Sequence, residues 1–139
     1  MRRRITLSQV SSLYPGVVLS TILPNGVEHF GVLTELHFLY GVHPTLISAS
    51  KRRQAVVEEP PQQFALGAPI YAHGAWSDQP WEVTVDNARS QLGVPYRLDD
   101  RNCEHFVRFC HGLPQESPQL TRAVGAAIIG GAILWMLAA

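Results

Sequence analysis

The chain has little cysteine, little charge and no excess of charge of either sign. Its 139 residues include two cysteines, Cys103 and Cys110, too few for a disulfide-stabilised scaffold. Charged residues make up 16% of the chain, and eleven Lys plus Arg balance eleven Asp plus Glu. A chain without net positive charge has no field that attracts nucleic acid, so we expect no nucleic-acid partner. The length allows one domain and a tail.

Short apolar runs between turn residues predict an antiparallel sheet. Pro24-Asn25-Gly26 closes the first run, and Pro60-Pro61 ends the last because proline cannot donate to a strand ladder. Residues 67–81 are rich in glycine, proline and aromatics without a period, and we interpret them as a loop or lid over a site. We expect an α+β fold with four to five antiparallel strands packed on helices. The strands that the pattern predicts are 17–23, 29–35, 44–50 and 54–59.

Two short helices are predicted in the second half of the chain. The first ends near Gly93, and the second spans 103–111 with Asn102 as its N-cap. Cys103 then lies in the first helical turn, where the macrodipole and unpaired backbone N–H groups favour a thiolate. Because seven residues of helix rise about 10.5 Å, Cys103 should not form a disulfide with Cys110.

The motif around this cysteine resembles that of a known family. It begins at the expected N-cap and reads Asn102-Cys103-Glu104-His105-Phe106-Val107. This run is similar to the NCEHF motif of the lecithin:retinol acyltransferase-like family, which includes the H-Ras-like suppressor phospholipases and acyltransferases. Residues 89–98 resemble the helix and strand that precede this motif. Pro15-Gly16 and His29-Phe30-Gly31 resemble its entry to the first strand and its base motif, so that the resemblance covers roughly residues 13–112.

The resemblance implies a permuted papain-like fold in which the histidine precedes the cysteine. Cys103 is then the nucleophile at a helix N-terminus, and His29 is the general base. The implied activity is that of a thiol-dependent phospholipase A or acyltransferase, which cleaves a phospholipid or other acyl ester through an acyl-cysteine. It implies no cofactor.

The third member of the site departs from the family, which commonly has a histidine on the strand after the base. Ser48 lies on the expected return strand, where its hydroxyl could orient the imidazole of His29. His43 keeps the residue type but falls in the loop beside Pro44. We favour Ser48, because orientation of the imidazole depends on geometry rather than on side-chain identity.

Other functions remain open at this point. A cysteine peptidase or amidase acting on peptide or cell-wall amides would use the same residues. A non-enzymatic, membrane-attached binding module would keep the fold without forming an acyl-enzyme. We expect no metal ion, because one short helix cannot turn all of its cysteines and histidines toward one tetrahedral centre. The residues concerned are Cys103, His105, Cys110 and His111.

The end of the chain is apolar all round. Residues 123–139 contain no charged residue and no proline, and as a helix they would span about 25 Å. We interpret them as a membrane anchor that places the site at a lipid surface, with the catalytic domain on the cytoplasmic side. The expected organisation is an N-terminal tail over 1–12, an acyltransferase-like domain over 13–118 and a hydrophobic segment over 119–139.

Overall fold

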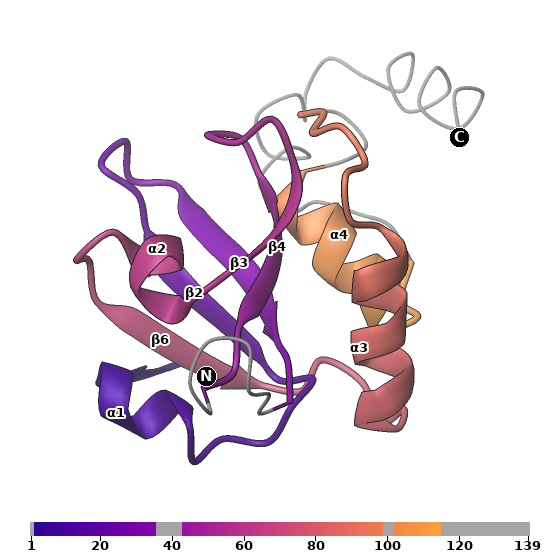
Figure 1. Cartoon of the computed structure of the whole chain (residues 1–139), viewed down its shortest axis with the longest axis horizontal. Helices are drawn as coiled ribbons and strands as arrows, with labels where there is room; N and C mark the ends of the chain where they lie inside the picture. The colour runs from indigo at the N-terminus through magenta and orange to yellow at the C-terminus, as the bar shows by residue number, and fades with distance from the viewer. Residues whose placement is uncertain (1, 36–42, 99–101, 115–139) are drawn as a thin grey trace, which may run out of the picture.

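The fold is α+β, with one antiparallel sheet between layers of short helices (Figure 1). The computed structural model describes residues 2–35, 43–98 and 102–114. Within these residues the strands are β1 (Arg3–Ile5), β2 (Val18–Ile22), β3 (Glu28–Leu33), β4 (Leu46–Ser50), β5 (Ala55–Glu59) and β6 (Ile70–Gly74). The helices are α1 (Leu7–Val10), α2 (Pro61–Ala65), α3 (Trp81–Ser90) and α4 (Cys103–Cys110). The six described strands follow the order β1-β6-β2-β3-β4-β5.

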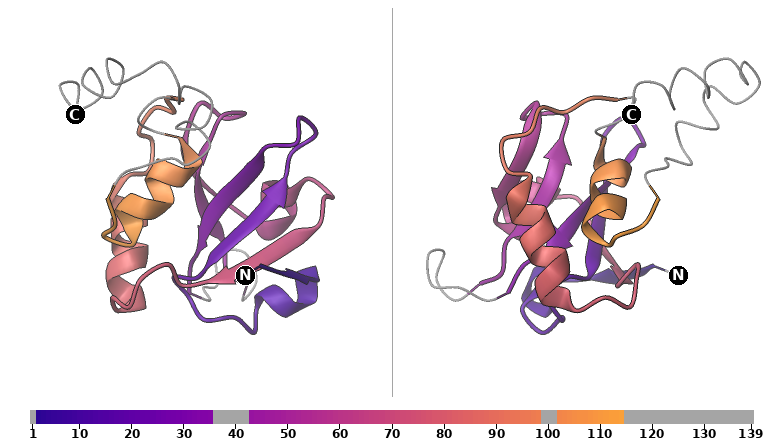
Figure 2. Two further views of the ribbon diagram at one scale, coloured as in Figure 1. Left: turned by 180° about the vertical axis from the view of Figure 1, so that it is seen from behind. Right: turned by 90° about the vertical axis from the view of Figure 1, so that its right-hand side faces the viewer.

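Each face of the sheet carries its own apolar cluster, because successive side chains of a strand point to opposite faces. Figure 2 shows α3 and α4 on one face, where Phe30 and Val32 of β3 pack against α4. On the other face, Leu33 of the same strand packs in a cluster with Phe64 of α2. We call these the α4 face and the α2 face.

The structure confirms an antiparallel sheet in an α+β fold, with more strands than the four to five expected. The loop interpretation of 67–81 is wrong over Ile70–Gly74, which pairs with both β1 and β2 as strand β6. This strand has only five residues between glycine- and proline-rich turns, so its alternation was too short to stand out. Residues 1–12, expected to be a tail, contribute the edge strand β1 and the helix α1.

Gly16, in the Pro15-Gly16 entry to β2, should tolerate no side chain. It has a φ of +83°, and an added Cβ would lie 3.1 Å from Trp81 Cβ and 3.3 Å from Trp81 Cα. Gly26 has a similar φ of +84° with no atom within 4 Å of such a Cβ, which makes it a matched control. We expect Gly26→Ala to cost about 1 kcal/mol of unfolding free energy, from the left-handed backbone.

Gly16→Ala should cost about 2 to 3 kcal/mol, since the contact with the backbone of α3 adds to the same backbone strain. Urea denaturation of both variants measures the difference. Equal losses would show that α3 moves away from Gly16 without cost.

Among the described residues, no helix is long and apolar enough to cross a membrane. Residues 123–139, the expected anchor, lie outside the described residues, and the anchor therefore stays a prediction.

Candidate functional site

Asn102 fixes the N-terminus of α4 through hydrogen bonds that involve both the oxygen and the nitrogen of its side-chain amide. Its Oδ1 accepts a hydrogen bond from the backbone N–H of His105 at 3.0 Å, which caps the helix as the sequence predicts. Its Nδ2 donates to the carbonyl oxygen of Leu98 at 2.8 Å. Asn102 therefore ties the segment before the helix to the first turn, in which Cys103 is the first residue.

Cys103 lies against a part of β3 that β4 leaves unpaired. The β3–β4 ladder pairs Val32 and Leu33 but does not extend to the start of β3. The Sγ atom of Cys103 lies 3.8 Å from the carbonyl oxygen of Glu28, to which the thiol donates. The backbone N–H of Phe30 also points to this sulfur. The thiol thus contacts the backbone groups of the two residues on either side of His29.

The thiol is protonated at neutral pH in this structure. Burial raises the pKa of Cys103 to about 11, and Glu104 adds to the increase. Backbone N–H groups of Phe30 and of the first helical turn lower the pKa, but by less than burial raises it. The thiolate that the helix position predicts is therefore not the resting state, because Cys103 is only 8% exposed.

The imidazole of His29 lies on the face of the sheet opposite to Cys103. Its ring packs on Phe64 with the centroids 4.8 Å apart, on the α2 face. Burial, with a smaller effect from Arg52, lowers the pKa of His29 to about 4, so that the ring is neutral at neutral pH. The structure brings the backbone around His29 to Cys103, but it does not bring the two side chains together.

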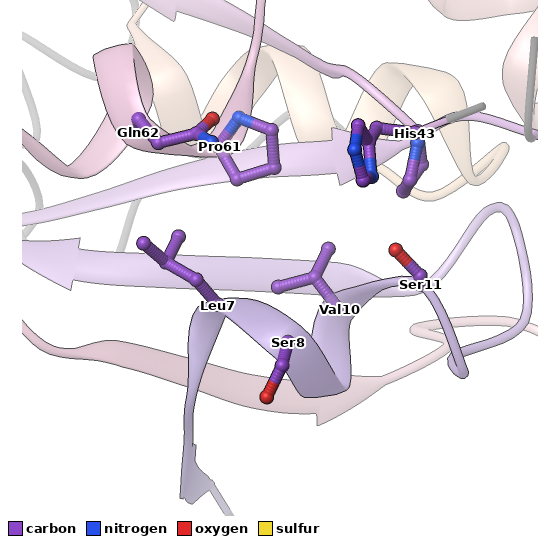
Figure 3. Close-up of a pocket in the computed structure, with 8 residues that line it drawn as sticks. Leu7, Ser8, Val10, Ser11, His43, Pro61 and Gln62 are labelled. Carbon is purple, nitrogen blue, oxygen red and sulfur yellow. The ribbon is translucent and has the colours of Figure 1, made fainter. Parts of the chain in front are cut away.

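Ser48 shares the α2 face with His29. Its neighbours in β4, Ile47 and Ala49, belong to the α4-face cluster, and Ser48 is buried between them with its side chain on the other face. His43, the alternative, is exposed and lines a hollow of about 330 Å3 between α1 and α2 (Figure 3). Within the described part of the chain, no hydrogen bond joins Ser48 or His43 to His29, and the orienting role stays a prediction.

A polar cluster on the α4 face was not predicted from the sequence. The Oε2 atom of Glu28 accepts a hydrogen bond from Ser20 Oγ at 2.6 Å and pairs with Arg2 at 2.9 Å. His73 Nε2 lies 2.7 Å from Ser20 Oγ and 3.3 Å from Glu28 Oε2. His73 falls within the expected loop 67–81, and it is instead half-buried in β6 with its ring 5.4 Å from that of Phe30.

The hydrogen bonds of this cluster depend on the ionisation of Glu28. Burial alone raises the pKa of Glu28, but Ser20, Arg2 and His73 together lower it, and the carboxylate is ionised at neutral pH. The Ser20 hydroxyl then donates its hydrogen bond to the carboxylate, and the His73 tautomer that carries a proton on Nε2 donates to Ser20 Oγ. Alternation in Ile70-Tyr71-Ala72-His73 was the only sequence signal for this arrangement.

The described residues contain no group of three or more His, Cys, Asp and Glu side chains placed to hold a metal ion. No family model, no curated protein and no solved structure matches this chain.

Proposed function

We propose that the chain is a thiol-dependent phospholipase A or acyltransferase with a permuted papain-like fold, similar to the lecithin:retinol acyltransferase-like family. The observation that carries the proposal is the position of Cys103 at a capped helix N-terminus, against the backbone on either side of His29 that β4 does not pair with. A helix N-terminus offers backbone N–H groups both to a sulfur and to the oxyanion of an acyl-transfer intermediate. The motif Asn102-Cys103-Glu104-His105-Phe106 supports the same chemistry by resemblance.

The reaction would begin when His29 takes the thiol proton of Cys103 and the sulfur attacks the ester carbonyl carbon. His29 is neutral at neutral pH, so its ring nitrogen is free to accept the proton, and its basicity would rise as the ring leaves the burial that lowers its pKa. Its ring would first have to leave Phe64 and turn past the edge of β3, where β4 leaves the strand open. The proton then goes to the leaving alcohol, and water or an acyl acceptor cleaves the thioester. Ser48, on the α2 face, would orient the imidazole from β4 before the ring turns.

The substrate class we propose is a phospholipid or another acyl ester at a membrane surface. The apolar segment 123–139 would hold the domain there, on the cytoplasmic side. This part of the proposal depends on the sequence alone.

Trapping of the acyl-enzyme tests the proposal. The full-length chain is mixed with phosphatidylcholine vesicles that carry a labelled acyl chain, and peptide mapping locates the label. We expect the label on Cys103 through a hydroxylamine-sensitive thioester, and none in Cys103→Ala. Label that persists in Cys103→Ala would contradict the proposal. Cleavage of a muropeptide amide with no lipid label would also contradict it and would favour the peptidase alternative.

The same assay compares His29, the proposed base, with His73, the histidine of β6 that lies beside Phe30. His29→Gln should slow acylation at least 100-fold, and His73→Gln should slow it less. The reverse ranking would move the base to His73, which lies on the same face of the sheet as Cys103.

One observation favours the non-enzymatic binding module as the second candidate. The resting thiol is buried and protonated, and the nearest predicted base has its ring on the opposite face. For a binding module, we expect vesicle binding with no labelled cysteine at any pH.

A further inference from the structure

The register of the sheet directs the carbonyl group of Glu28 at the thiol. Leu23 and Val27 form a hydrogen-bonded pair, in which the Leu23 N–H donates to the Val27 carbonyl at 2.9 Å. Hydrogen-bonded and non-hydrogen-bonded pairs alternate in an antiparallel ladder, so that Glu28, the next residue, turns its carbonyl away from β2. The β3–β4 ladder does not reach this position, and the Cys103 thiol donates to the carbonyl, with Sγ 3.8 Å from the oxygen. The thiol therefore takes the place that a residue of β4 would hold in a longer ladder.

The carboxylate of Glu28 is anchored at three points. Its Oε2 atom accepts a hydrogen bond from Ser20 Oγ at 2.6 Å, and it lies 3.3 Å from His73 Nε2 and 2.9 Å from Arg2 Nη1. Ser20 is completely buried, and its strand β2 lies inside the sheet between β6 and β3. Because β3 begins at Glu28, directly after the exposed turn 24–27, these contacts hold the end of the strand against the interior of the sheet.

Glu28 also precedes His29, the proposed base, in the chain. Proton transfer to a base requires the donor and the acceptor to lie within hydrogen-bond reach of each other. A thiol rotates about its Cα–Cβ and Cβ–Sγ bonds, so that an unrestrained proton points in several directions. The Glu28 carbonyl selects the direction toward the backbone next to His29, where the imidazole would arrive after its turn past the edge of β3.

We propose that Glu28 is a positioning residue for Cys103. Its anchored carboxylate keeps the start of β3 in place, and its carbonyl holds the thiol so that the proton faces the incoming imidazole of His29. When the imidazole takes the proton, the S–H bond breaks, its electron pair stays on the sulfur, and the hydrogen bond to the Glu28 carbonyl is lost. Glu28 itself takes no proton. The inference rests on the proposed acyl-transfer function, because the direction of the thiol proton matters only for its transfer to a base.

Glu28→Ala tests this role with the full-length chain in detergent micelles and 4-nitrophenyl octanoate as the probe. Without its anchor, the start of β3 should release the thiol, and two rates should change in opposite directions. We expect the rate of the nitrophenolate burst to fall about 10- to 30-fold, with its half-saturating octanoate concentration nearly unchanged, because the proton no longer faces the base. Alkylation of Cys103 by iodoacetamide at pH 7.5 should rise about 3- to 10-fold, because a released thiol is less buried and ionises more readily.

Glu58 supplies a matched control on another strand, β5. Its Oε2 atom accepts a hydrogen bond from Thr45 Oγ1 at 2.6 Å and lies 3.8 Å from Arg89 Nη2. Glu58→Ala removes a comparable anchor and should change neither rate by more than twofold, with urea denaturation to show that both alanine variants are folded. Glu28→Gln keeps an oxygen that accepts from Ser20, and both of its rates should lie within about threefold of the parent chain.

Three outcomes would overturn the role of Glu28. Parallel changes of the two rates in Glu28→Ala would indicate a general change at the thiol rather than a lost orientation. Rates within twofold of the parent chain would show that the anchor does not hold the thiol. Failure of Glu28→Gln to restore the rates would show that the charge, and not the anchored position, matters. If Glu28→Ala does not fold, Ser20→Ala removes one anchor alone and should shift the two rates about threefold in the same opposite directions.

The outcome for Cys103→Ala separates this proposal from the function on which it rests. If Cys103→Ala keeps the burst, the acyl-enzyme proposal fails, and the positioning role in proton transfer fails with it. If Cys103→Ala loses the burst and Glu28→Ala behaves as the parent chain, only the role of Glu28 is wrong.

Discussion

Iodoacetamide should alkylate Cys103 about 100-fold more slowly in the folded chain than in urea at pH 7.5. The thiolate is the reactive species, and burial raises the pKa of Cys103 from an ordinary 9.0 to about 11, which lowers the thiolate fraction about 100-fold. The rate in the folded chain should rise about tenfold per pH unit from pH 7 toward pH 10. Mass spectrometry of timed samples measures both rates.

The shape of the pH profile separates protonation from steric access. Poor access alone would lower the rate at every pH and leave the plateau of an ordinary thiol near pH 9. Such a plateau would show that the backbone N–H groups offset burial, and a plateau at a lower pH would show that they outweigh it. Because the folded-state pKa is the higher one, stability falls as pH rises between about 9 and about 11, and circular dichroism must confirm folding there. Cys110 should react after Cys103, since it is fully buried and burial raises its pKa as well.

Acid should destabilise the domain through His29, by about 3 kcal/mol between pH 6.5 and about pH 4. Burial of the neutral ring against Phe64, with Arg52 nearby, lowers the folded-state pKa from 6.5 to about 4. The unfolded chain therefore binds a proton first as the pH falls, and stability is lost through this window. Urea denaturation at pH 7 and pH 4 measures the loss.

His29→Gln should remove most of this pH dependence, whatever its effect on stability at pH 7. Part of it will remain, because the pKa values of His73 and His111 are also lowered in the folded state, chiefly by burial. His43→Gln, at an exposed histidine, should keep the full dependence. Equal dependence in His29→Gln and in the parent would show that His29 is not buried in a neutral form.

Local patterns in the sequence predicted the parts of the fold with strong signals. Four strands, β2 to β5, follow from apolar runs that end at turn residues, and α4 begins at its predicted N-cap, Asn102. The helices and strands that these patterns did not predict are short. α2 is a single turn that begins at Pro61, and α1 has four residues with a capping box between Thr6 and Gln9. Elements of this length take their stability from packing rather than from propensity, so their sequences say little.

The sequence by itself determined which thiol begins a helix, because an N-cap and a helix start are local properties. The tertiary structure alone decided which face of the sheet each strand residue occupies. β3 is buried on both faces, so the alternation in Glu28–Leu33 could not show whether His29 or Phe30 faces α4. The protonation of Cys103 and the position of the His29 ring on the face opposite to it also depend on the fold. Burial and proximity sum contributions from residues that are distant in the chain, and no local pattern contains them.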